Sequence, residues 1–388
     1  MTGFDGAARS PVFFEDTLLM LRDQVRRFVE TEIKPHADAW EEAGRVPRDL
    51  LLKMGELGFL GIRYPEALGG SALDQRATVV WAEELGRCTY AGVAITALVH
   101  TDMASVHIFN AGNDAQKAEW LPRCITGEAL SAVAVTEPGA GSDVKGITTR
   151  GRRDGDDWIL NGTKMFITNG VQADVYCVAA KTDPDARPSQ SVTMFLVEKG
   201  TAGFTVSRAL DKHGWRSSDT AELSFDEVRV PARNVLGCEG AGFYEIMKNF
   251  QNERLVLGAM AMGEAQAALD LTLAYLRERK AFGATLWEKQ AIRQRLAMLA
   301  ARVEACRQFV YVTAARAAAG EDVVREVSMI KALAGELVNE VMYDCVQFHG
   351  GMGFMRESTI ERMARDARVQ SIGGGATEVM LEEVAKRM

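Results

Sequence analysis

Apolar residues in the first third of the chain recur every three or four positions, the period of a helix that is buried on one side. The clearest stripe is Leu18, Leu21, Val25 and Phe28, and Lys34-Pro35 closes it. Similar patterns predict further helices over residues 49–60, 79–85, 93–109 and 116–125. We therefore expect an all-α domain over residues 1–130.

At Leu130 the pattern changes to short β-rich runs separated by Gly, Pro, Asn and Asp, from LSAVAVTEP to TAELSFDEVRVP. Regular spacing and hairpin-like turns predict a compact β domain over residues 131–237, either a small barrel or paired sheets. Helical periodicity then returns over 241–280, 291–319, 326–348, 357–367 and 377–388. The expected fold is therefore a multidomain α+β chain, whose third domain, residues 238–388, is a four-helix-bundle type of helical domain.

One helix of the third domain carries a carboxylate on its apolar face. Ile246, Phe250, Leu257 and Met260 form that face, and Glu253 falls on it. An ionised carboxylate is costly to bury, so a group in this place is expected to have a raised pKa and to suit general-base chemistry. The alternative is that Glu253 lies at the edge of the stripe or pairs with a neighbouring cation such as Arg254.

Composition narrows the class of protein. The 388 residues are 47% hydrophobic and 25% charged, as in soluble globular proteins, and the net charge of −8 gives no overall field for nucleic acid. The six cysteines are scattered without a C-x-x-C pair, which favours reduced thiols in a cytosol-like compartment. No run approaches the roughly 18 apolar residues of a membrane span, and the N-terminus lacks a long apolar segment. We expect a cytoplasmic protein with no membrane span.

Two glycine-rich strings suggest a ligand that carries phosphate. GGMGF at 350–354 follows a long predicted helix, and IGGGAT at 372–377 leads into the last one. Exposed backbone N–H groups and a helix dipole favour anions at such places, although both strings could equally be plain turns. The motifs of common nucleotide-binding folds, serine hydrolases and zinc proteases are absent, and the five histidines form no metal-ligand spacing.

A third feature points to a flat, polar-edged ring. TEPGAGSD at 136–143 reads as a strand that ends in a hydroxyl-rich loop, and KMFITNG follows at 164–170. Thr136, Ser142 and Thr168 could hydrogen-bond the edge of the ring, while Phe166 offers an apolar face. A flavin ring is bound through both kinds of contact: hydrogen bonds to its polar edge and apolar packing against its face.

Six strings follow one another along the chain: AVTEPGAGSD, KMFITNG, ERLVLGAMAMG, RKAFG, QFHGGMGF and ARDARVQSIGGGATE. Taken together and in this order, they resemble the acyl-CoA dehydrogenase family over essentially the whole chain. The resemblance implies a homotetrameric flavoprotein of fatty acid metabolism, of the β-oxidation type. It would bind FAD between the β domain and the C-terminal bundle and would be reoxidised by an electron-transferring flavoprotein.

In that family a carboxylate removes the α-proton of an acyl-CoA while the β-hydrogen passes as hydride to flavin N5. Many members carry the carboxylate in a Tyr-Glu-Gly string before the last helix, but Gly374 stands at that place here. A subset that includes the long-chain and isovaleryl-CoA dehydrogenases carries it in an E-R-L string instead, which places the catalytic role on Glu253.

The resemblance also implies the binding residues. FAD contacts would fall on Val133, Val135, Thr136, Gly141, Ser142, Phe166, Ile167, Thr168, Arg279, Phe282, Gln290, Gln347, Gly350, Gly351, Thr377 and Glu378. Acyl-CoA contacts would fall on Ser142, Tyr244, Asn252, Arg254, Gly374 and Gly375. Two positions depart from the family: Phe166 replaces a frequent Trp, and Ala376 replaces a common Thr whose contact Thr377 would have to make.

The helix predicted over 241–280 is too long for one site to use both of its ends. Glu253 and Arg279 would lie about 39 Å apart along its axis, so one cofactor cannot easily touch both within a chain. The family arrangement resolves this, because Arg279 would reach the FAD of a neighbouring subunit. An obligate oligomer is therefore expected.

The function expected from the resemblance is the FAD-dependent oxidation of a saturated acyl-CoA to the trans-2-enoyl-CoA. Two alternatives remain open: an acyl-CoA oxidase that passes electrons to oxygen, and a flavin- or acyl-CoA-binding protein without turnover. The length and branching of the acyl chain depend on side chains around 90–103 and 244–257, whose orientation a sequence does not give.

Overall fold

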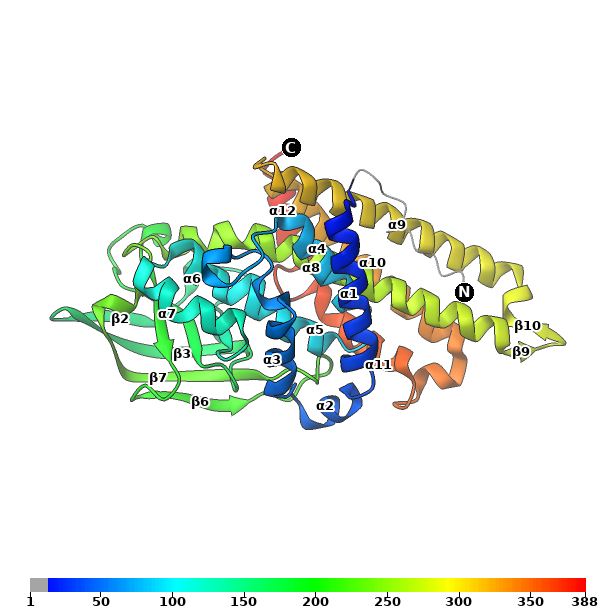
Figure 1. Ribbon diagram of the computed structural model, residues 1–388, viewed down its shortest axis with the longest axis horizontal. Helices are drawn as coiled ribbons and strands as arrows, with labels where there is room; N and C mark the ends of the chain where they lie inside the picture. The colour runs from blue at the N-terminus through cyan, green and yellow to red at the C-terminus, as the bar shows by residue number, and fades with distance from the viewer. Residues whose placement is uncertain (1–12) are drawn as a thin grey trace.

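The computed structural model describes residues 13–388, which form an elongated molecule with a β domain at one end and long helices that run to the other (Figure 1). The N-terminal helices are α1 (Asp16–Phe28), η2 (Val29–Ile33), α2 (Ala37–Ala43), α3 (Arg48–Glu56), η3 (Phe59–Gly61), η4 (Glu66–Leu68), α4 (Gln75–Gly86), α5 (Ala91–Leu98), η5 (Val99–Ala104), α6 (Ser105–Ala111) and α7 (Asp114–Ile125). Of these, α1 and α5 lie between the β domain and the long helices, and α6 and α7 lie over the β domain. Every helix predicted for this domain is confirmed. The short α2 was not predicted, because seven residues are too few to show a clear period.

Two expectations from composition can be compared with the structure. One helical stretch, Ala91–Ala111, is long and apolar enough to cross a membrane, but 89% of its most apolar window is buried inside the protein, as in the core helix of a soluble domain. All six cysteines are free thiols, and Cys238 is exposed while the other five are buried. Those five are small core residues.

The β domain is one mixed eight-stranded sheet. Its strands are β1 (Ser131–Ala134), β2 (Arg150–Asp154), β3 (Asp157–Thr168), β4 (Val175–Lys181), β5 (Val192–Glu198), β6 (Phe204–Ala209), β7 (Thr220–Val230) and β8 (Val235–Leu236). The order is β6-β7-β3-β2-β4-β5-β8, and β1 pairs in parallel with β4. No pairing in residues 13–388 joins β6 to β8, so the barrel-like sheet is open at its edges.

The middle of this sheet is covered on both faces. Tyr176 and Val178 of β4 point into a core shared with β3, β5 and β7, while Val175 and Cys177 pack against helices α6 and α7. A strand buried on both sides shows a continuous apolar run rather than an alternating one. This accounts for the sequence VYCVAA in β4.

The C-terminal domain is built on three long helices, α8 (Gly242–Glu278), α9 (Gln290–Ala318) and α10 (Val324–His349), with the shorter α11 (Thr359–Ala367) and α12 (Thr377–Ala385) packed onto them. A small hairpin, β9 (Lys280–Ala281) and β10 (Ala284–Thr285), and the turn η9 (Leu286–Glu288) join α8 to α9. The turns η10 (Gly350–Phe354) and η11 (Arg368–Ser371) follow α10 and α11. Helix α8 starts beside the β domain and ends at the opposite tip of the molecule (Figure 1).

Glycines let α8 cross α4 at very short range. A Cβ on Gly263 would lie 2.0 Å from the carbonyl oxygen of Glu83, and one on Gly86 would lie 2.2 Å from that of Met260. Such contacts are far shorter than any real Cβ makes. The two glycines therefore let the helices pack closely, and this contact fixes the position of α8, and with it Glu253, relative to α4.

We expect Gly263→Ala to lower the free energy of unfolding by about 1–3 kcal/mol, because the added methyl group forces α4 and α8 apart. Ala274→Ser on the exposed side of the same helix is the matched control and should change stability by less than about 0.5 kcal/mol. Thermal and denaturant unfolding of the two variants measure this. Equal stability of both would show that the crossing is not tight.

Candidate active site

Glu253 lies inside the apolar face of α8, as its spacing predicts. Its exposed fraction is 7%, and Ile246 and Met260 on the same face are fully buried. Burial raises the pKa of the Glu253 carboxyl to about 8, although a hydrogen bond from Asn249 and the charge of Arg254 pull it downward. A carboxyl with a pKa near neutrality can take up and release a proton at physiological pH.

Glu253 and Arg254 do not form an ion pair among residues 13–388, although the charge of Arg254 acts on the carboxyl. Oε1 of Glu253 instead accepts a hydrogen bond of 2.9 Å from the amide of Asn249. Arg254 is 8% exposed, points toward the hydroxyl of Ser328 at 3.4 Å and leaves its Nε without a partner. Glu253 and Arg254 therefore have different hydrogen-bond partners.

The glycine loop before α12 faces the same helix. Gly374 has φ +65°, and a Cβ built on it would lie 2.3 Å from Cδ1 of Leu257. Leu257 is one turn beyond Glu253 on the same face of α8. A glutamate at position 374 would therefore need both a strained backbone and the space of Leu257, and Gly374 is consistent with a base at Glu253 instead.

Lys331 of α10 holds this loop and was missed by the sequence analysis. It is 2% exposed and donates to the carbonyl oxygens of Gln370 and Gly375, one at each end of the loop. Burial lowers its pKa to about 8. The signal that could have found Lys331 is its place on an apolar stripe with Val327 and Val338, which parallels the place of Glu253.

The two segments proposed to hold a flavin come together at the ends of β1 and β3. The N–H of Met165 donates to the carbonyl of Thr136 at 2.8 Å, and the pairing of β3 with β7 shifts register between Lys164 and Ile167. This bulge turns Phe166 outward, with φ +61° and 66% of the residue exposed. An exposed ring held on a strained strand end is a suitable platform for a flat cofactor.

A buried ion pair ties these two segments together. Nζ of Lys164 lies 2.8 Å from Oε1 of Glu137, and neither side chain is more than 2% exposed. Burial tends to raise the pKa of Glu137, but the charge of Lys164 and hydrogen bonds from Thr148 and Thr149 outweigh it and lower the pKa to about 2. Burial lowers the pKa of Lys164 to about 8, so both groups are charged at neutral pH.

We expect Lys164→Met to lower the free energy of unfolding by about 3–5 kcal/mol, because it leaves the Glu137 carboxylate buried and unpaired. The pair stabilises the fold above pH 4.5, the ordinary pKa of the carboxyl, and this contribution is lost as the pH falls toward about 2. Lys248→Met, at an exposed site of α8, is the control and should cost less than about 0.5 kcal/mol. An equal loss in both variants, measured by denaturant unfolding, would contradict the importance of the pair.

The remaining residues predicted for the cofactor lie in three parts of the fold. One group lies at the ends of β1 and β3 or in the loop after β1: Val133, Val135, Thr136, Gly141, Ser142, Ile167 and Thr168. A second group lies after α8, at the start of α9, in the last turn of α10 or in η10: Arg279, Phe282, Gln290, Gln347, Gly350 and Gly351. Phe282 is 96% exposed at the tip of the β9–β10 hairpin. Thr377 and Glu378 begin α12, and the buried Oγ1 of Thr377 has no hydrogen-bond partner in residues 13–388. That hydroxyl is free to make the contact expected of it.

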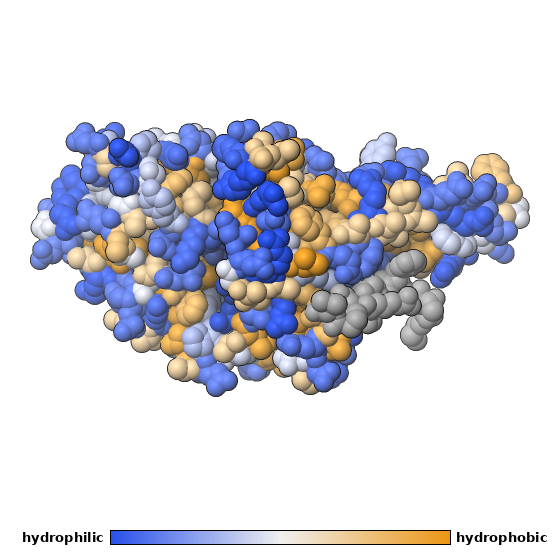
Figure 2. All heavy atoms as spheres, turned by 90° about the horizontal axis from the view of Figure 1, so that it is seen from above, coloured by the Kyte–Doolittle hydropathy of each residue, from blue (hydrophilic) through white to orange (hydrophobic). Residues whose placement is uncertain are grey.

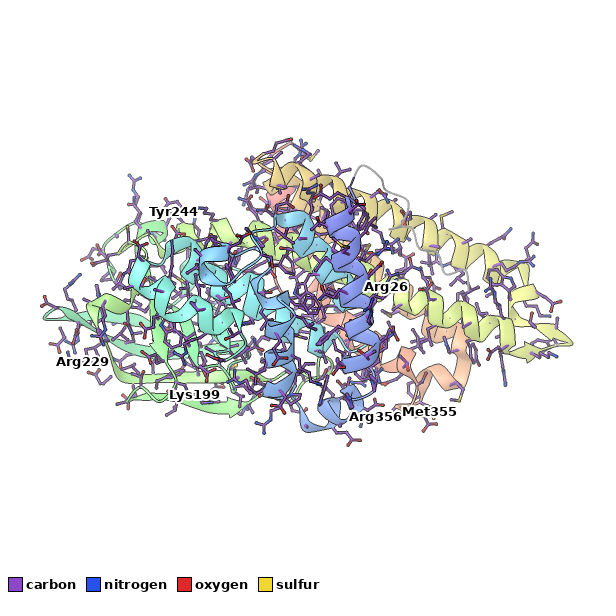
Figure 3. All side chains as sticks on the ribbon, in the orientation of Figure 1. Arg26, Lys199, Arg229, Tyr244, Met355 and Arg356 are labelled. Carbon is purple, nitrogen blue, oxygen red and sulfur yellow. The ribbon has the colours of Figure 1, made fainter. Side chains whose placement is uncertain are left out.

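The residues predicted for the substrate are also divided. Tyr244 is 54% exposed at the upper edge of the molecule beside the β domain, while Met355 and Arg356 lie at its lower edge (Figure 3). The side chain of Asn252 is used within the protein, since it accepts from Arg63 at 2.6 Å and donates to Asp102. Gly375, with φ +105°, adjoins Gly374 in the loop that Lys331 holds. Their roles toward a substrate stay predictions.

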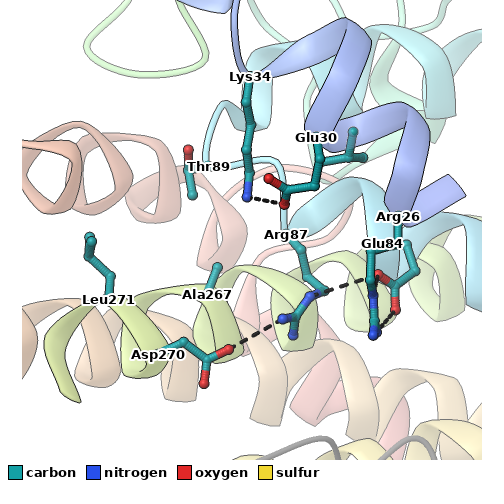
Figure 4. Close-up of a pocket in the computed structure, with 10 residues that line it drawn as sticks. Arg26, Glu30, Lys34, Glu84, Arg87, Thr89, Ala267, Asp270 and Leu271 are labelled. Atoms are coloured by element: carbon teal, nitrogen blue, oxygen red, sulfur yellow. Dashed lines mark hydrogen bonds and ion pairs between the residues drawn. The ribbon is translucent and has the colours of Figure 1, made fainter. Parts of the chain in front are cut away.

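A cleft of about 250 Å³ lies elsewhere, between α1, α4 and α8 (Figure 4). Its cations face anions: Arg26 lies 2.6 Å from Glu84, and Arg87 lies 3.3 Å from Asp270. Ala267 of its wall is 14 residues beyond Glu253 on α8, about 21 Å along the axis. The cleft is therefore not part of the site around Glu253.

Sequence models of three domains match the chain in order, and they are described as the N-terminal, middle and C-terminal domains of acyl-CoA dehydrogenase, at residues 15–128, 132–228 and 240–388. The chain belongs to the acyl-CoA dehydrogenase family. It is an oxidoreductase that acts on CH–CH bonds, and the three-domain fold predicted from the sequence is that of the family.

Individual relatives cover nearly the whole chain. The long-chain specific acyl-CoA dehydrogenase of Sus scrofa is 41% identical over 95% of this chain and 86% of its own. The isovaleryl-CoA dehydrogenase of Pongo abelii is 38% identical over 92% of this chain and 85% of its own. The crystal structure of a probable acyl-CoA dehydrogenase from Mycobacterium abscessus superposes with a TM-score of 0.94 at 43% identity, covering 97% of this chain and 99% of that one.

Acyl-CoA dehydrogenases depend on FAD, and this chain is a flavoprotein of that family. A glutaryl-CoA dehydrogenase from Mycobacterium smegmatis, solved in complex with FADH2, superposes with a TM-score of 0.92 at 30% identity, covering 98% of this chain and 96% of that one. The residues present here fit the cofactor. Phe166 is turned outward, a Cβ on Gly139 or Gly141 would meet nothing within 4 Å, and the hydroxyl of Thr377 is without a partner.

Proposed function

We propose that the protein oxidises a saturated acyl-CoA to the trans-2-enoyl-CoA, with Glu253 as the base that removes the α-proton. The observation that carries the proposal is the buried carboxyl of Glu253 on the apolar face of α8, whose pKa is raised to about 8 and which lies opposite a glycine loop that has no carboxylate of its own. A base for a weakly acidic carbon needs a pKa near the working pH, and burial supplies it.

The roles of the chain's own residues follow from this. Oε1 of Glu253 is held by Asn249, so Oε2 is the oxygen that takes the proton. The apolar neighbours Leu257 and Met260 limit water around the carboxyl, which would otherwise lower its pKa. Lys331 holds the glycine loop toward this space, where its backbone N–H groups could orient the thioester. FAD, when bound, supplies the oxidant that accepts the β-hydride.

Anaerobic addition of acyl-CoAs to the FAD-loaded enzyme tests the proposal. A panel of straight-chain substrates of increasing length and of branched ones is scored by bleaching of the flavin absorbance. We expect rapid bleaching by at least one of them, and relatives with long-chain and isovaleryl specificity define the range to search. Binding of these compounds without any bleaching would favour a protein that binds flavin and acyl-CoA without turnover.

We further infer that the electrons leave through an electron-transferring flavoprotein rather than through oxygen. The support is membership in the acyl-CoA dehydrogenase family. Turnover in air with substrate alone should release little hydrogen peroxide, while an electron-transferring flavoprotein should restore turnover. Stoichiometric peroxide in air would identify an acyl-CoA oxidase.

We propose a homotetramer in which neighbouring subunits complete each FAD site. Helix α8 ends at Glu278, and the following Arg279 lies about 39 Å from Glu253 along the helix axis. Phe282, Tyr343 and Phe354 are each at least 74% exposed in the single chain, as expected of surface that a neighbour covers. In the view from above, apolar side chains show between charged ones over the helical half (Figure 2). Sedimentation of a monomer with fully bound FAD would contradict this.

A further inference from the structure

Asn249 makes the only hydrogen bond that residues 13–388 offer to the Glu253 carboxylate. The two residues are four positions apart on α8, so their side chains lie one above the other on the same face of the helix. Asn249 is 2% exposed, and water therefore does not compete for its amide.

The direction of this hydrogen bond is fixed by a third group. Nδ2 of Asn249 also donates to the main-chain carbonyl of Asp102 at 3.1 Å. A carbonyl can only accept, so the nitrogen of the amide has to face Asp102, and the same nitrogen then offers its second hydrogen to Glu253. An amide held in this way donates to an ionised carboxylate and cannot turn to accept from a protonated one.

The carbonyl of Asp102 is held in position by the turn to which it belongs. Asp102 lies in η5, a π-helical turn, where the carbonyls of His100, Thr101 and Asp102 all accept hydrogen bonds from side chains. Asn252 also donates to the Asp102 carbonyl, at 3.2 Å. The turn therefore presents a fixed acceptor to α8.

We propose that Asn249 is a positioning residue for the reaction: its amide, held by the Asp102 carbonyl, fixes Oε1 of Glu253 and leaves Oε2 as the oxygen that accepts the α-proton. This rests on the proposed role of Glu253 as the base. The charged groups that surround the carboxyl are Arg254 on its own helix, Asp102 on η5 with Arg63 at 3.9 Å from it, and Lys331 on α10 near Arg254. None of these donates a hydrogen bond to Glu253.

Asn249→Leu tests the proposal, because leucine has a similar size and no donor. The first readout is a ¹³C NMR titration of glutamate carboxyl carbons, in which the Glu253 signal is identified by its loss in Glu253→Gln. We expect the pKa of Glu253 to rise by about one unit or more, and kcat/KM below that pKa to fall about tenfold or more while substrate binding changes little. Asn249→Ser, whose hydroxyl is too short to reach Glu253, should shift the pKa in the same direction and serves if the leucine variant does not fold.

Asn339→Leu is the matched control. Asn339 is a part-buried amide of α10 that also donates to two carbonyls, those of Gly335 and Ala367, but it does not touch Glu253. Its loss should lower stability and leave the pKa of Glu253 unchanged. An unchanged pKa in the Asn249 variants, with Glu253→Gln still inactive, would overturn the positioning role alone. Undiminished flavin reduction by Glu253→Gln would overturn the proposed function itself.

Discussion

Glu253→Gln is expected to slow the reduction of bound flavin by acyl-CoA about 10³-fold, the middle of the range that a general base contributes. The amide has nearly the shape of the carboxyl but cannot accept the α-proton. The flavin spectrum and the binding of acyl-CoA should be retained, since Glu253 itself is not among the residues predicted to contact FAD or acyl-CoA. Stopped-flow bleaching under anaerobic conditions measures the rate.

Glu264→Gln is the matched control for this experiment. Glu264 lies on the same helix, is 3% exposed, and burial raises its pKa to about 8 as well, but it accepts its hydrogen bond from Gln370, well away from Glu253. Flavin reduction in Glu264→Gln should stay near normal. A thousandfold loss in Glu264→Gln, or near-normal bleaching in Glu253→Gln, would contradict the assignment of the base.

The kcat/KM of the parent enzyme should depend strongly on pH. Burial places the pKa of Glu253 at about 8, and only the ionised carboxyl can act as a base, so kcat/KM should rise about tenfold per pH unit below pH 8 and level off above it. This parameter reports the free enzyme, to which the structure applies. Between pH 6 and 8 the expected increase is about 50-fold, because about 1% of the carboxyl is ionised at pH 6 and half of it at pH 8.

The same pKa has a consequence for stability. Because the folded pKa of Glu253 is above its ordinary value of 4.5, ionisation opposes folding increasingly as the pH rises from about 4.5 to about 8. Glu253→Gln should therefore be at least as stable as the parent above pH 8.

The activity prediction has its own contradicting outcome. A kcat/KM that is flat between pH 6 and 8, with the chemical step limiting, would place the pKa of the base well below about 8.

Periodicity was sufficient for most of the fold. The long helices were predicted to within a few residues, because stripes such as that of α8 persist over many turns. The open edges of the sheet were not predicted, since closure depends on the register of β6 and β8, which local sequence does not determine. Helix α2 was not predicted, because its seven residues are too few to show a helical period.

A residue of the candidate site could be predicted from the sequence only where it breaks the polar–apolar pattern of its own helix or strand. Glu253 did so because an acidic residue interrupts an apolar face. Glu137 and Lys164 did not, because they are 27 positions apart and meet only through the pairing of strands around the Phe166 bulge. Asn249 could not be predicted for the same reason: its amide is oriented by the carbonyl of Asp102, which belongs to the N-terminal domain.

The most direct test of the account is exchange of the α-hydrogen of an acyl-CoA in D₂O. A 3-thia-acyl-CoA serves as the probe, because it has no β-hydrogen to donate and so isolates proton transfer from hydride transfer. The FAD-loaded parent enzyme should exchange the α-hydrogen for deuterium, and Glu253→Gln should do so about 10³-fold more slowly. Equal exchange rates in the two proteins would show that another group removes the proton.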